Sequence, residues 1–441
     1  MKNTIQKTID HAMSLGADSC DVIVNAAESM SLSAQDGKLD KYKVSNTSIL
    51  GVRVIKNKRI GLAYSESFDA DALEFAAMSA VENSAYSDIN ELETITVKNP
   101  TDYIKKNTST KDESSIEEKI EFALKLESEV KKRDARVQTI PYSGLSIAES
   151  KSYYLNSLGT YTEVHDNYLS AYTSALVKEA DRTATHSGST MGRALSQLSV
   201  KECVDVALEH SINWLSAKPV ATGKYDVIFH PDILAEMLSA FSNYFSAKAA
   251  IEKTNPWENK INQVVAIAGF SLIDVPSYKE AFTEYHVDSE GMIKKDLSLI
   301  ENGVLKSFYH NTVTAKHFKT TSTGHAYRGP RSSLNVTRTN WLIPTGSTTE
   351  PDMTEGTYLE IIDVMGLGSG DNISGEFSFG ASGYLCKDGK RIQPVKEITV
   401  AGNFNKLLMD ISRMGRELKH NSSLSVFSPT IRFSHLSVAG K

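Results

Sequence analysis

Histidine spacing is the first test for a hydrolytic metal site in this sequence. A zinc hydrolase needs two histidines about one helical turn apart, with a glutamate beside them, so that two nitrogens reach one metal and the carboxylate activates its water. His230 opens an amphipathic run, but one turn further along stand Leu234 and Ala235, and the nearest carboxylates are Asp232 and Glu236. The sequence therefore predicts no zinc site at His230.

Three more histidines, His310, His317 and His325, lie close together in the sequence. His310 and His317 could share a helical face, but two turns would separate them by about 10 Å along the helix axis. That spacing is too long for two ligands of one ion on a straight helix. We therefore expect surface or hydrogen-bonded histidines, and we assign no metal ligand and no catalytic residue to this chain.

The three cysteines are Cys20, Cys203 and Cys386. An odd number of widely separated cysteines fits neither a disulfide framework nor a CxxC metal site, and indicates a reducing compartment. The opening residues lack the apolar segment of a signal peptide, so we expect a cytoplasmic protein. Cys386 follows the β-like run FSFGASGYL and precedes a Lys-Asp-Gly turn, which favours a structural thiol over a nucleophile.

Two segments could contact an extended peptide. The run Gly366-Leu367-Gly368-Ser369-Gly370 is followed by a further β-like run, where a dinucleotide loop would need a helix. It is either a bend in a sheet or a surface that another backbone can approach closely. Two arginines flank Gly329-Pro330 and either stay solvated or hold a carboxylate through paired hydrogen bonds. The candidate peptide-binding residues are Gly366, Gly368, Gly370, Arg328 and Arg331.

In the N-terminal half, the sequence predicts helices and antiparallel strands in turn. Apolar spacing predicts a helix from Thr4 to Leu15, and β-rich runs broken by Asp36-Gly37 predict an antiparallel meander from Asp21 to Glu66. A capping box from Ser115 to Glu118 begins another helix. Alternating runs then predict more antiparallel sheet.

The Pro- and Gly-containing segment AKPVATGK indicates a domain boundary, so we divide the chain into domains 1–218 and 219–441. The second domain opens with the strand YDVIF and a helix with Pro231 in its first turn. Gly-punctuated hairpins follow, and NKLLMDISRMGREL predicts a final helix. The predicted class is α+β, with two domains that each have a mainly antiparallel sheet and flanking helices.

The composition argues against two classes of partner, nucleic acids and membranes. The 441 residues include 48 Lys and Arg against 54 Asp and Glu, which gives a formal net charge of −6. A chain without a global positive field is unsuited to direct nucleic-acid binding. No stretch approaches the ~18 consecutive apolar residues of a membrane span, so we expect no membrane partner.

Four segments of the C-terminal half resemble, in the same order, segments of the TldD/PmbA family, which is also known as a family of proposed modulators of DNA gyrase. They are HVDSEGMIKKDLSLIENGVLKSFYHNTVTAKHF, TSTGHAYR, SGEFSFGASGYL and PVKEITVAGNF. In the N-terminal half, GADSCDVIVNA and SILGVRVIKNKRIGLAYSES resemble the opening sheet of the same family. The resemblance covers most of the chain.

The resemblance implies a cytoplasmic protease complex of two paralogous subunit types that trims peptides, including leader sequences of peptide antibiotics and an antitoxin. The TldD type carries HExxxH and a later cysteine as zinc ligands, whereas the PmbA/TldE type lacks them. If His230 stands at the first histidine of that motif, Pro231 replaces the glutamate and Ala235 replaces the second histidine. No cysteine follows Cys386. The chain is therefore most similar to the PmbA/TldE type.

These expectations give one leading hypothesis and two alternatives. The leading hypothesis is a non-catalytic subunit that binds peptide and completes the cleft of a partner, with zinc only in an HExxxH paralogue. Its expected partners are that TldD-like paralogue, a peptide substrate and, in the absence of the paralogue, a second copy in a homodimer. The alternatives are a binding regulator of DNA gyrase without a protease role, and a stand-alone peptidase with a site of another kind.

Overall fold

The computed structural model describes residues 1–95, 103–105, 112–367 and 370–441. The chain divides into two compact units. The N-terminal unit comprises Met1–Glu209, Val287–Lys294 and His310–Val336, and the C-terminal unit comprises His210–His286, Lys295–Tyr309 and Thr337–Lys441. Two segments from the second half of the sequence thus belong to the N-terminal unit. The division of the chain into domains 1–218 and 219–441 stays a prediction.

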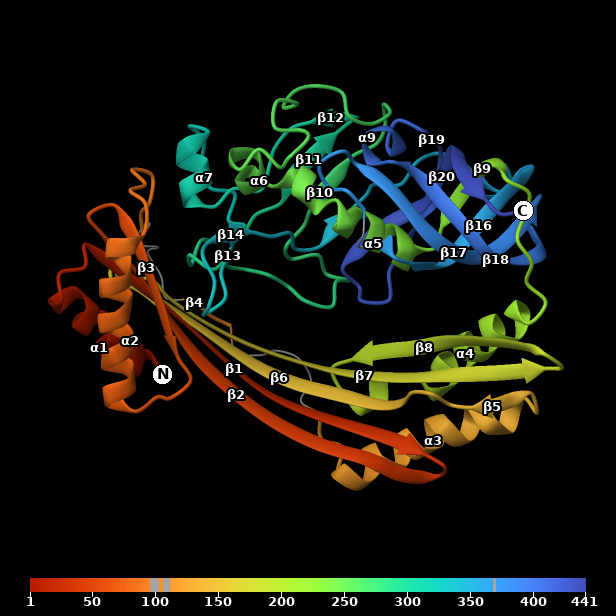
Figure 1. The fold of residues 1–441 in the computed structure, drawn as a ribbon, viewed down its shortest axis with the longest axis horizontal. Helices are drawn as coiled ribbons and strands as arrows, with labels where there is room; N and C mark the ends of the chain where they lie inside the picture. Colours follow the sequence, from red (N-terminus) through yellow and green to blue (C-terminus); the bar gives the residue numbers. More distant parts are fainter. Residues whose placement is uncertain (96–102, 106–111, 368–369) are drawn as a thin grey trace. The chain divides into compact units, whose positions relative to one another are not determined.

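An eight-stranded sheet forms the centre of the N-terminal unit in the described chain (Figure 1). Its strands lie in the order β3-β2-β1-β6-β7-β4, and β5 and β8 also pair with β7. Within the described part of this sheet, only the pairing of β4 with β7 is parallel. The strands are β1 (Ser19–Gln35), β2 (Lys38–Lys56), β3 (Arg59–Ser65), β4 (Tyr103–Lys105), β5 (Val137–Thr139), β6 (Ser143–Asn156), β7 (Tyr161–Glu179) and β8 (Arg182–Gly192).

The first three strands confirm the predicted meander. β1 and β2 pair antiparallel around the Asp36-Gly37 turn, and β2 and β3 pair around residues 57–58. Asp36 and Gly37 both have positive φ, a conformation that asparagine, aspartate and glycine adopt more readily than other residues. The turn residues therefore fix where each strand reverses.

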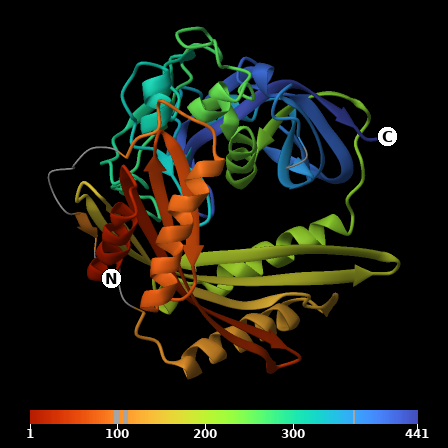
Figure 2. The same ribbon diagram turned by 60° about the vertical axis from the view of Figure 1, so that its left-hand side comes forward.

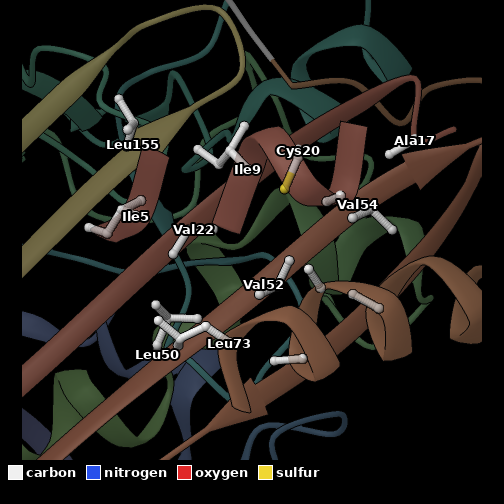
Figure 3. Close-up of a cluster of buried hydrophobic side chains, with 14 of the residues drawn as sticks. Ile5, Ile9, Ala17, Cys20, Val22, Leu50, Val52, Val54, Leu73 and Leu155 are labelled. Atoms are coloured by element: carbon white, nitrogen blue, oxygen red, sulfur yellow. The ribbon is translucent and has the colours of Figure 1, made fainter. Parts of the chain in front are cut away.

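Helices cover one face of this sheet at two separate places. At one end, Ile5 and Ile9 of α1 pack with Val22, Leu50 and Val52 of β1 and β2 (Figure 3). Burial of each such side chain stabilises the fold by about 1.5–3 kcal/mol. At the other end, α3 packs its own apolar side chains against the sheet. The helices and turns are α1 (Lys2–Ser14), α2 (Ala70–Asn83), η1 (Ser84–Tyr86), α3 (Ile116–Arg133), η2 (Leu195–Gln197), α4 (Val200–Trp214) and α7 (Thr312–His317).

Two of the predicted helix starts are confirmed. α1 covers the predicted amphipathic segment, and α3 begins with the predicted capping box. Ser115 accepts a hydrogen bond from the backbone N of Glu118, and the Glu118 carboxylate accepts one from the backbone N of Ser115. The N-terminal unit also contains the short hairpin of β13 (Ala326–Tyr327) and β14 (Asn335–Val336).

The C-terminal unit contains a ten-stranded sheet, part of which closes on itself. β20, β18, β17, β16 and β9 are neighbours in that order, and β9 pairs again with β20 (Figure 2). Rings of Phe379 and Phe433 lie 6.5 and 5.5 Å from the ring of Phe229, centroid to centroid. The strands are β9 (Gly223–Phe229), β10 (Leu272–Asp274), β11 (Leu297–Glu301), β12 (Val304–Leu305), β15 (Trp341–Leu342), β16 (Thr357–Met365), β17 (Glu376–Lys387), β18 (Lys390–Asn403), β19 (Ile411–His420) and β20 (Val426–Ala439).

The predicted final helix over NKLLMDISRMGREL is wrong. Only Phe404–Leu407 forms a helix, and Ile411–His420 is β19, which pairs with β20. Ile411 and Met414 are buried, so long-range pairing outweighs the local helix preference of the segment. The remaining helices and turns of this unit are α5 (Pro231–Ala240), η3 (Ser242–Phe245), α6 (Ala247–Ile251), α8 (Glu350–Met353) and α9 (Phe404–Leu407).

Both units combine mainly antiparallel sheet with flanking helices, which confirms the predicted α+β class. The parallel pairings in the C-terminal unit are β15 with β20 and β16 with β9. Across the described ranges, no helix combines the length and the apolar character that a bilayer crossing requires.

Candidate functional site

A pocket of about 370 Å³ lies at the start of α5 in the C-terminal unit. His230 is the N-cap of this helix, and its Nδ1 accepts a hydrogen bond from the backbone N of Asp232 at 3.4 Å. Pro231 occupies the first helical position, where a backbone N–H would have no partner within the helix, and proline has no such N–H. The polar and charged lining side chains are His230, Glu360, Lys419, His420, Ser428 and Thr430.

Asp232 lies between His230 and Ser422. Ser422 donates from its backbone N and its hydroxyl to Oδ1 of Asp232, at 2.6 and 2.7 Å, and Nδ1 of His230 lies 3.4 Å from Oδ2. Burial alone would raise the pKa of Asp232, but the neighbouring His230 ring and the hydrogen bonds from Ser422 lower it. A nucleophilic serine needs the imidazole beside its hydroxyl and the carboxylate behind the imidazole. Because the carboxylate lies in the middle, this arrangement does not activate Ser422.

The pocket residues do not fit a zinc site. The Glu360 carboxylate is held by Arg391 at 2.7 and 3.2 Å, and Nδ1 of His420 lies 3.1 Å from the carbonyl oxygen of Asn421. Throughout the described part of the chain, no three His, Cys, Asp or Glu side chains are grouped so that they could hold a metal ion. A catalytic zinc needs three protein ligands.

The other three candidate histidines, His310, His317 and His325, lie in the N-terminal unit. His310 precedes α7, whereas His317 is its last residue, so the two do not share a helical face. Burial lowers the pKa of His310 to about 4, so its ring is neutral at physiological pH. Nδ1 of His325 lies within 3.0 Å of the carbonyl and hydroxyl oxygens of Thr323. These positions fit histidines that stabilise local structure.

The three cysteines are buried and free. Burial raises the pKa of Cys386 to about 11, which keeps its thiol protonated at neutral pH. Burial raises the pKa of Cys20 still further. A protonated, buried thiol is a poor nucleophile, so the cysteines pack as small apolar side chains.

The glycine-rich run connects β16 to β17. Gly366 follows β16 directly and has a φ of +83°, and the backbone N of Gly370 donates to the carbonyl of Leu367 at 3.2 Å. A Cβ at Gly370 would lie 3.4 Å from the ring of Phe241. Gly368 lies outside the described residues. The peptide-binding role of this run stays a prediction.

Arg328 is a buried residue of the N-terminal unit. Its Nη2 donates to Oδ1 of Asp21 at 2.5 Å, and Arg53 donates to Oδ2 of the same carboxylate from Nε at 2.9 Å. All three side chains are at most 1% exposed. Burial lowers the pKa of Arg328, although Asp21 acts in the opposite direction. Of the two alternatives for Arg328, the structure shows the one in which it holds a carboxylate, but that carboxylate belongs to the chain itself. The peptide-binding role of Arg328 and Arg331 stays a prediction.

The N-terminal unit contains two further buried carboxyl groups, Asp288 and Glu290, and the charge of Glu290 acts on Arg53. Oε2 of Glu290 accepts hydrogen bonds from the backbone N and the hydroxyl of Thr312, at 3.0 and 2.9 Å. Asp288 accepts from the backbone N of Ala326 at 3.0 Å. Burial, and then the charge of Asp288, raises the pKa of Glu290 to about 7. Glu290 thus changes its charge near neutral pH inside the N-terminal unit.

Arg331 lies at the surface, where it lines a groove of about 720 Å³ together with residues 46–49 of β2, Glu66 and residues 329–332. It pairs with Glu66, and its guanidinium carbon lies 4.6 Å above the ring of Tyr64. Pro330 packs against Gly51 so closely that a Cβ there would lie 2.0 Å from its carbonyl oxygen. Of the two candidate arginines, Arg328 is therefore buried and bound to Asp21, whereas Arg331 is exposed and lines the groove.

Sequence reasoning missed Asp21, Arg53, Asp288 and Glu290. A signal existed for the first two, because each interrupts an apolar strand pattern, in CDVIV and in GVRVI. A charge inside such a run predicts a buried ion pair. Glu290 lies in a Gly-punctuated hairpin segment, and nothing local distinguishes it from an exposed turn residue.

Comparison with known proteins finds matches along most of the chain. Three family descriptions match in succession: PmbA/TldA metallopeptidase domain 1 at residues 20–84, the central domain at 110–213, and the C-terminal domain at 222–440. The metalloprotease PmbA homolog of Haemophilus influenzae is 23% identical over 434 residues, which are 97% of this chain and 94% of that protein. A metalloprotease of Methanothermobacter thermautotrophicus is 23% identical over 90% of this chain and 88% of that protein.

Solved structures agree with this result at the level of the fold. A proposed modulator of a DNA gyrase from Thermotoga maritima superposes with a TM-score of 0.87 at 23% identity, over 99% of this chain and all of that one. TldE from Thermococcus kodakarensis superposes with a TM-score of 0.85 at 20% identity, again over 99% of this chain and all of that one. With three successive domain matches that span most of its length, the chain belongs to the PmbA/TldD family of metallopeptidases.

Proposed function

We propose that this chain is the TldE-type, non-catalytic subunit of a two-subunit cytoplasmic metallopeptidase that trims or degrades peptides. The observation that carries the proposal is the combination of family matches over most of the chain with a sequence in which no histidine is followed by glutamate. HExxxH supplies two zinc ligands and the general base of such a peptidase. A family member without it needs a partner for the chemical step.

The pocket at His230 supports the same proposal. Its carboxylate Glu360 is paired with Arg391, and Asp232 is held by Ser422. In the part of the chain that the structure describes, no group of three His, Cys, Asp or Glu side chains could hold a metal ion beside either carboxylate. Peptide binding and completion of the partner's cleft are the roles that this subunit supplies in the proposal.

Reconstitution with the HExxxH paralogue from the same genome tests the proposal. We expect fluorescein-labelled casein, an unstructured substrate, to be cleaved by the two chains together and by neither chain alone. The complex should contain about one zinc per pair. Cleavage by this chain alone would contradict the proposal and favour a stand-alone peptidase.

Matched variants locate the catalytic site. Glutamine in place of the glutamate of HExxxH in the paralogue should abolish cleavage by the complex. His230→Ala in this chain should leave the rate within about twofold, because His230 has no catalytic part in the proposal. Loss of cleavage in a correctly folded His230→Ala complex would contradict the assignment of the chemistry to the paralogue.

A further inference from the structure

One edge of β2 extends beyond its partner strand. β2 pairs with β3 from Lys56 opposite Arg59 to Leu50 opposite Ser65. The preceding stretch Lys38–Ile49 pairs with β1 on its other side. Within the described residues, no strand pairs with the outer edge of Lys38–Ile49. Backbone N–H and C=O groups on such an edge are ready to pair with another chain.

The two halves of this edge differ in charge. Lys38, Lys41 and Lys43 lie in the first half, with Asp40 between them, and the side chain of Lys41 is 78% exposed. Lysines are one of the devices by which natural sheets prevent pairing at an edge. The second half, Val44–Ile49, has no charged side chain. The protection against pairing therefore stops at Lys43.

The groove described above begins where the lysines end. Asn46–Ile49 forms one wall, and residues 329–332 form the other. The second wall is fixed, because Pro330 packs on Gly51 and Arg328 is anchored by Asp21. Asn46–Ile49 of this edge thus lines a preformed groove of about 720 Å³ together with Glu66 and residues 329–332. Preformed sites bind with a smaller loss of conformational entropy than sites that must be ordered.

We propose that Val44–Ile49 binds one extended polypeptide segment by strand addition, with the added strand antiparallel to β2 and in line with β3. This inference rests on the proposed function, because it identifies where the subunit would hold a peptide. Hydrogen bonds to the β2 backbone supply the affinity in this mode, and side chains set the preference. An antiparallel segment that continues along the edge passes Lys43 and Lys41, so acidic residues are favoured at its C-terminal end.

The probe is the fluorescently labelled decapeptide Val-Thr-Val-Thr-Val-Thr-Glu-Thr-Glu-Thr. In the proposed register its two glutamates lie opposite Lys43 and Lys41. The assay uses this chain alone, so that its result does not depend on a paralogue or on proteolysis. We expect saturable binding by fluorescence anisotropy, and no binding at all would overturn the inference.

N-methylation of the peptide tests strand addition directly. An added strand offers the N–H groups of alternate residues to β2, and the remaining N–H groups point away. N-methylation of one alternate set within the first six residues should weaken binding more than 10-fold, whereas the other set should change it less than threefold. Equal effects of the two sets would overturn the inference, since side-chain docking makes no such distinction.

Hydrogen exchange and charge reversal test the location. The peptide should slow amide exchange in Val44–Ile49, while Leu50–Lys56, which β3 already pairs, serves as the internal control. Lys41→Glu/Lys43→Glu should weaken binding about 10-fold or more, and a peptide with lysines in place of its glutamates should recover it. The control Lys7→Glu/Lys279→Glu changes the net charge by the same amount at exposed sites elsewhere. Its affinity for the decapeptide should stay within twofold of the wild-type affinity.

Two outcomes would assign the binding elsewhere and overturn the inference. One is slowed exchange in another segment with none in Val44–Ile49. The other is unchanged affinity of the Lys41→Glu/Lys43→Glu chain. Failure of the reconstituted protease would contradict the proposed function without changing these binding results, so the two proposals can fail separately.

Discussion

Arg328 donates to Asp21 across 2.5 Å, and the two residues are 307 positions apart in the sequence. Arg53 donates to the other oxygen of the same carboxylate, so one aspartate is shared by two arginines. All three side chains are inaccessible to solvent, where unpaired charges are strongly disfavoured. This ion cluster attaches residues 325–332 to the first strand of the N-terminal sheet.

Removal of the shared carboxylate should therefore destabilise the protein strongly. Asp21→Asn keeps the shape of the side chain but removes the carboxylate that the two buried guanidinium groups share. Breaking a buried ion pair in this way costs about 3–5 kcal/mol. Urea unfolding, followed by circular dichroism, measures the change. Asp40→Asn, at a half-exposed site on the same sheet, should change the stability by less than about 0.5 kcal/mol, and equal effects would contradict the argument.

The contact between Gly51 and Pro330 makes a second prediction. Gly51→Ala places a Cβ against the Pro330 carbonyl oxygen, so the loop must move away from the sheet. We expect a loss of about 1–3 kcal/mol in the free energy of unfolding and weaker binding of the decapeptide, because the groove loses its fixed wall. Gly329→Ala is the matched control, since its Cβ would meet only the Ser332 hydroxyl at 3.5 Å. Full stability and full binding in Gly51→Ala would show that the loop position is not needed.

Glu290 should make stability depend on pH. Its pKa of about 7 in the folded chain lies above its ordinary value of 4.5, so the folded state binds more protons between these values. The stabilisation is complete below about pH 4.5 and is lost as the pH rises through about 7. Glu290→Gln cannot ionise, so the fall in unfolding free energy between pH 5 and pH 8 should become shallower. The exposed Glu149→Gln should keep the wild-type slope, and identical slopes in all three chains would refute the assignment.

Metal content gives a direct test of the non-catalytic role. The purified chain should hold much less than one zinc per molecule after dialysis, because the described side chains provide no three-ligand group. Mass spectrometry of the metal content decides the question. About one tightly bound zinc, lost on mutation of His230, His310, His317 or His325, would contradict the proposed subunit type.

Association is the fifth prediction. We expect a homodimer when the chain is alone and a heterodimer when the HExxxH paralogue is supplied, with contacts through the C-terminal domain 219–441. Closed two-fold pairing is the commonest form of oligomer. Light scattering after size-exclusion chromatography gives the mass in each case. Elution as a monomer under both conditions at micromolar concentration would contradict this expectation.

The fold class and the local elements of the N-terminal half could be predicted from the sequence, because their signals are local. The Asp36-Gly37 turn and the Ser115–Glu118 capping box act within a few residues of chain. The helix predicted over 405–418 failed because β19 depends on β20, a partner that local periodicity does not reveal.

The candidate site was predictable only in part for the same reason. Arg331 lies in a groove, as a residue beside a Gly-Pro turn could, and Arg328 holds a carboxylate. The identity of that carboxylate depends on contacts across the whole chain. The edge at Val44–Ile49 has no local sequence signal either. It has no pairing partner in the described chain because β3 ends at Ser65, opposite Leu50, and the end of one strand cannot be read from the residues of another.

The distribution of the N-terminal unit over the sequence constrains the order in which it can fold during synthesis. Asp21 and Arg53 leave the ribosome early, whereas Glu290 and Arg328 follow only after most of the chain has been made. Until then Asp21 of β1 and Arg53 of β2 lack their later partners Arg328 and Glu290. Contacts of such long sequence separation close slowly, so a nascent chain holds this ion cluster incomplete for most of its translation. A fragment that stops at residue 218 would remain in that incomplete state permanently.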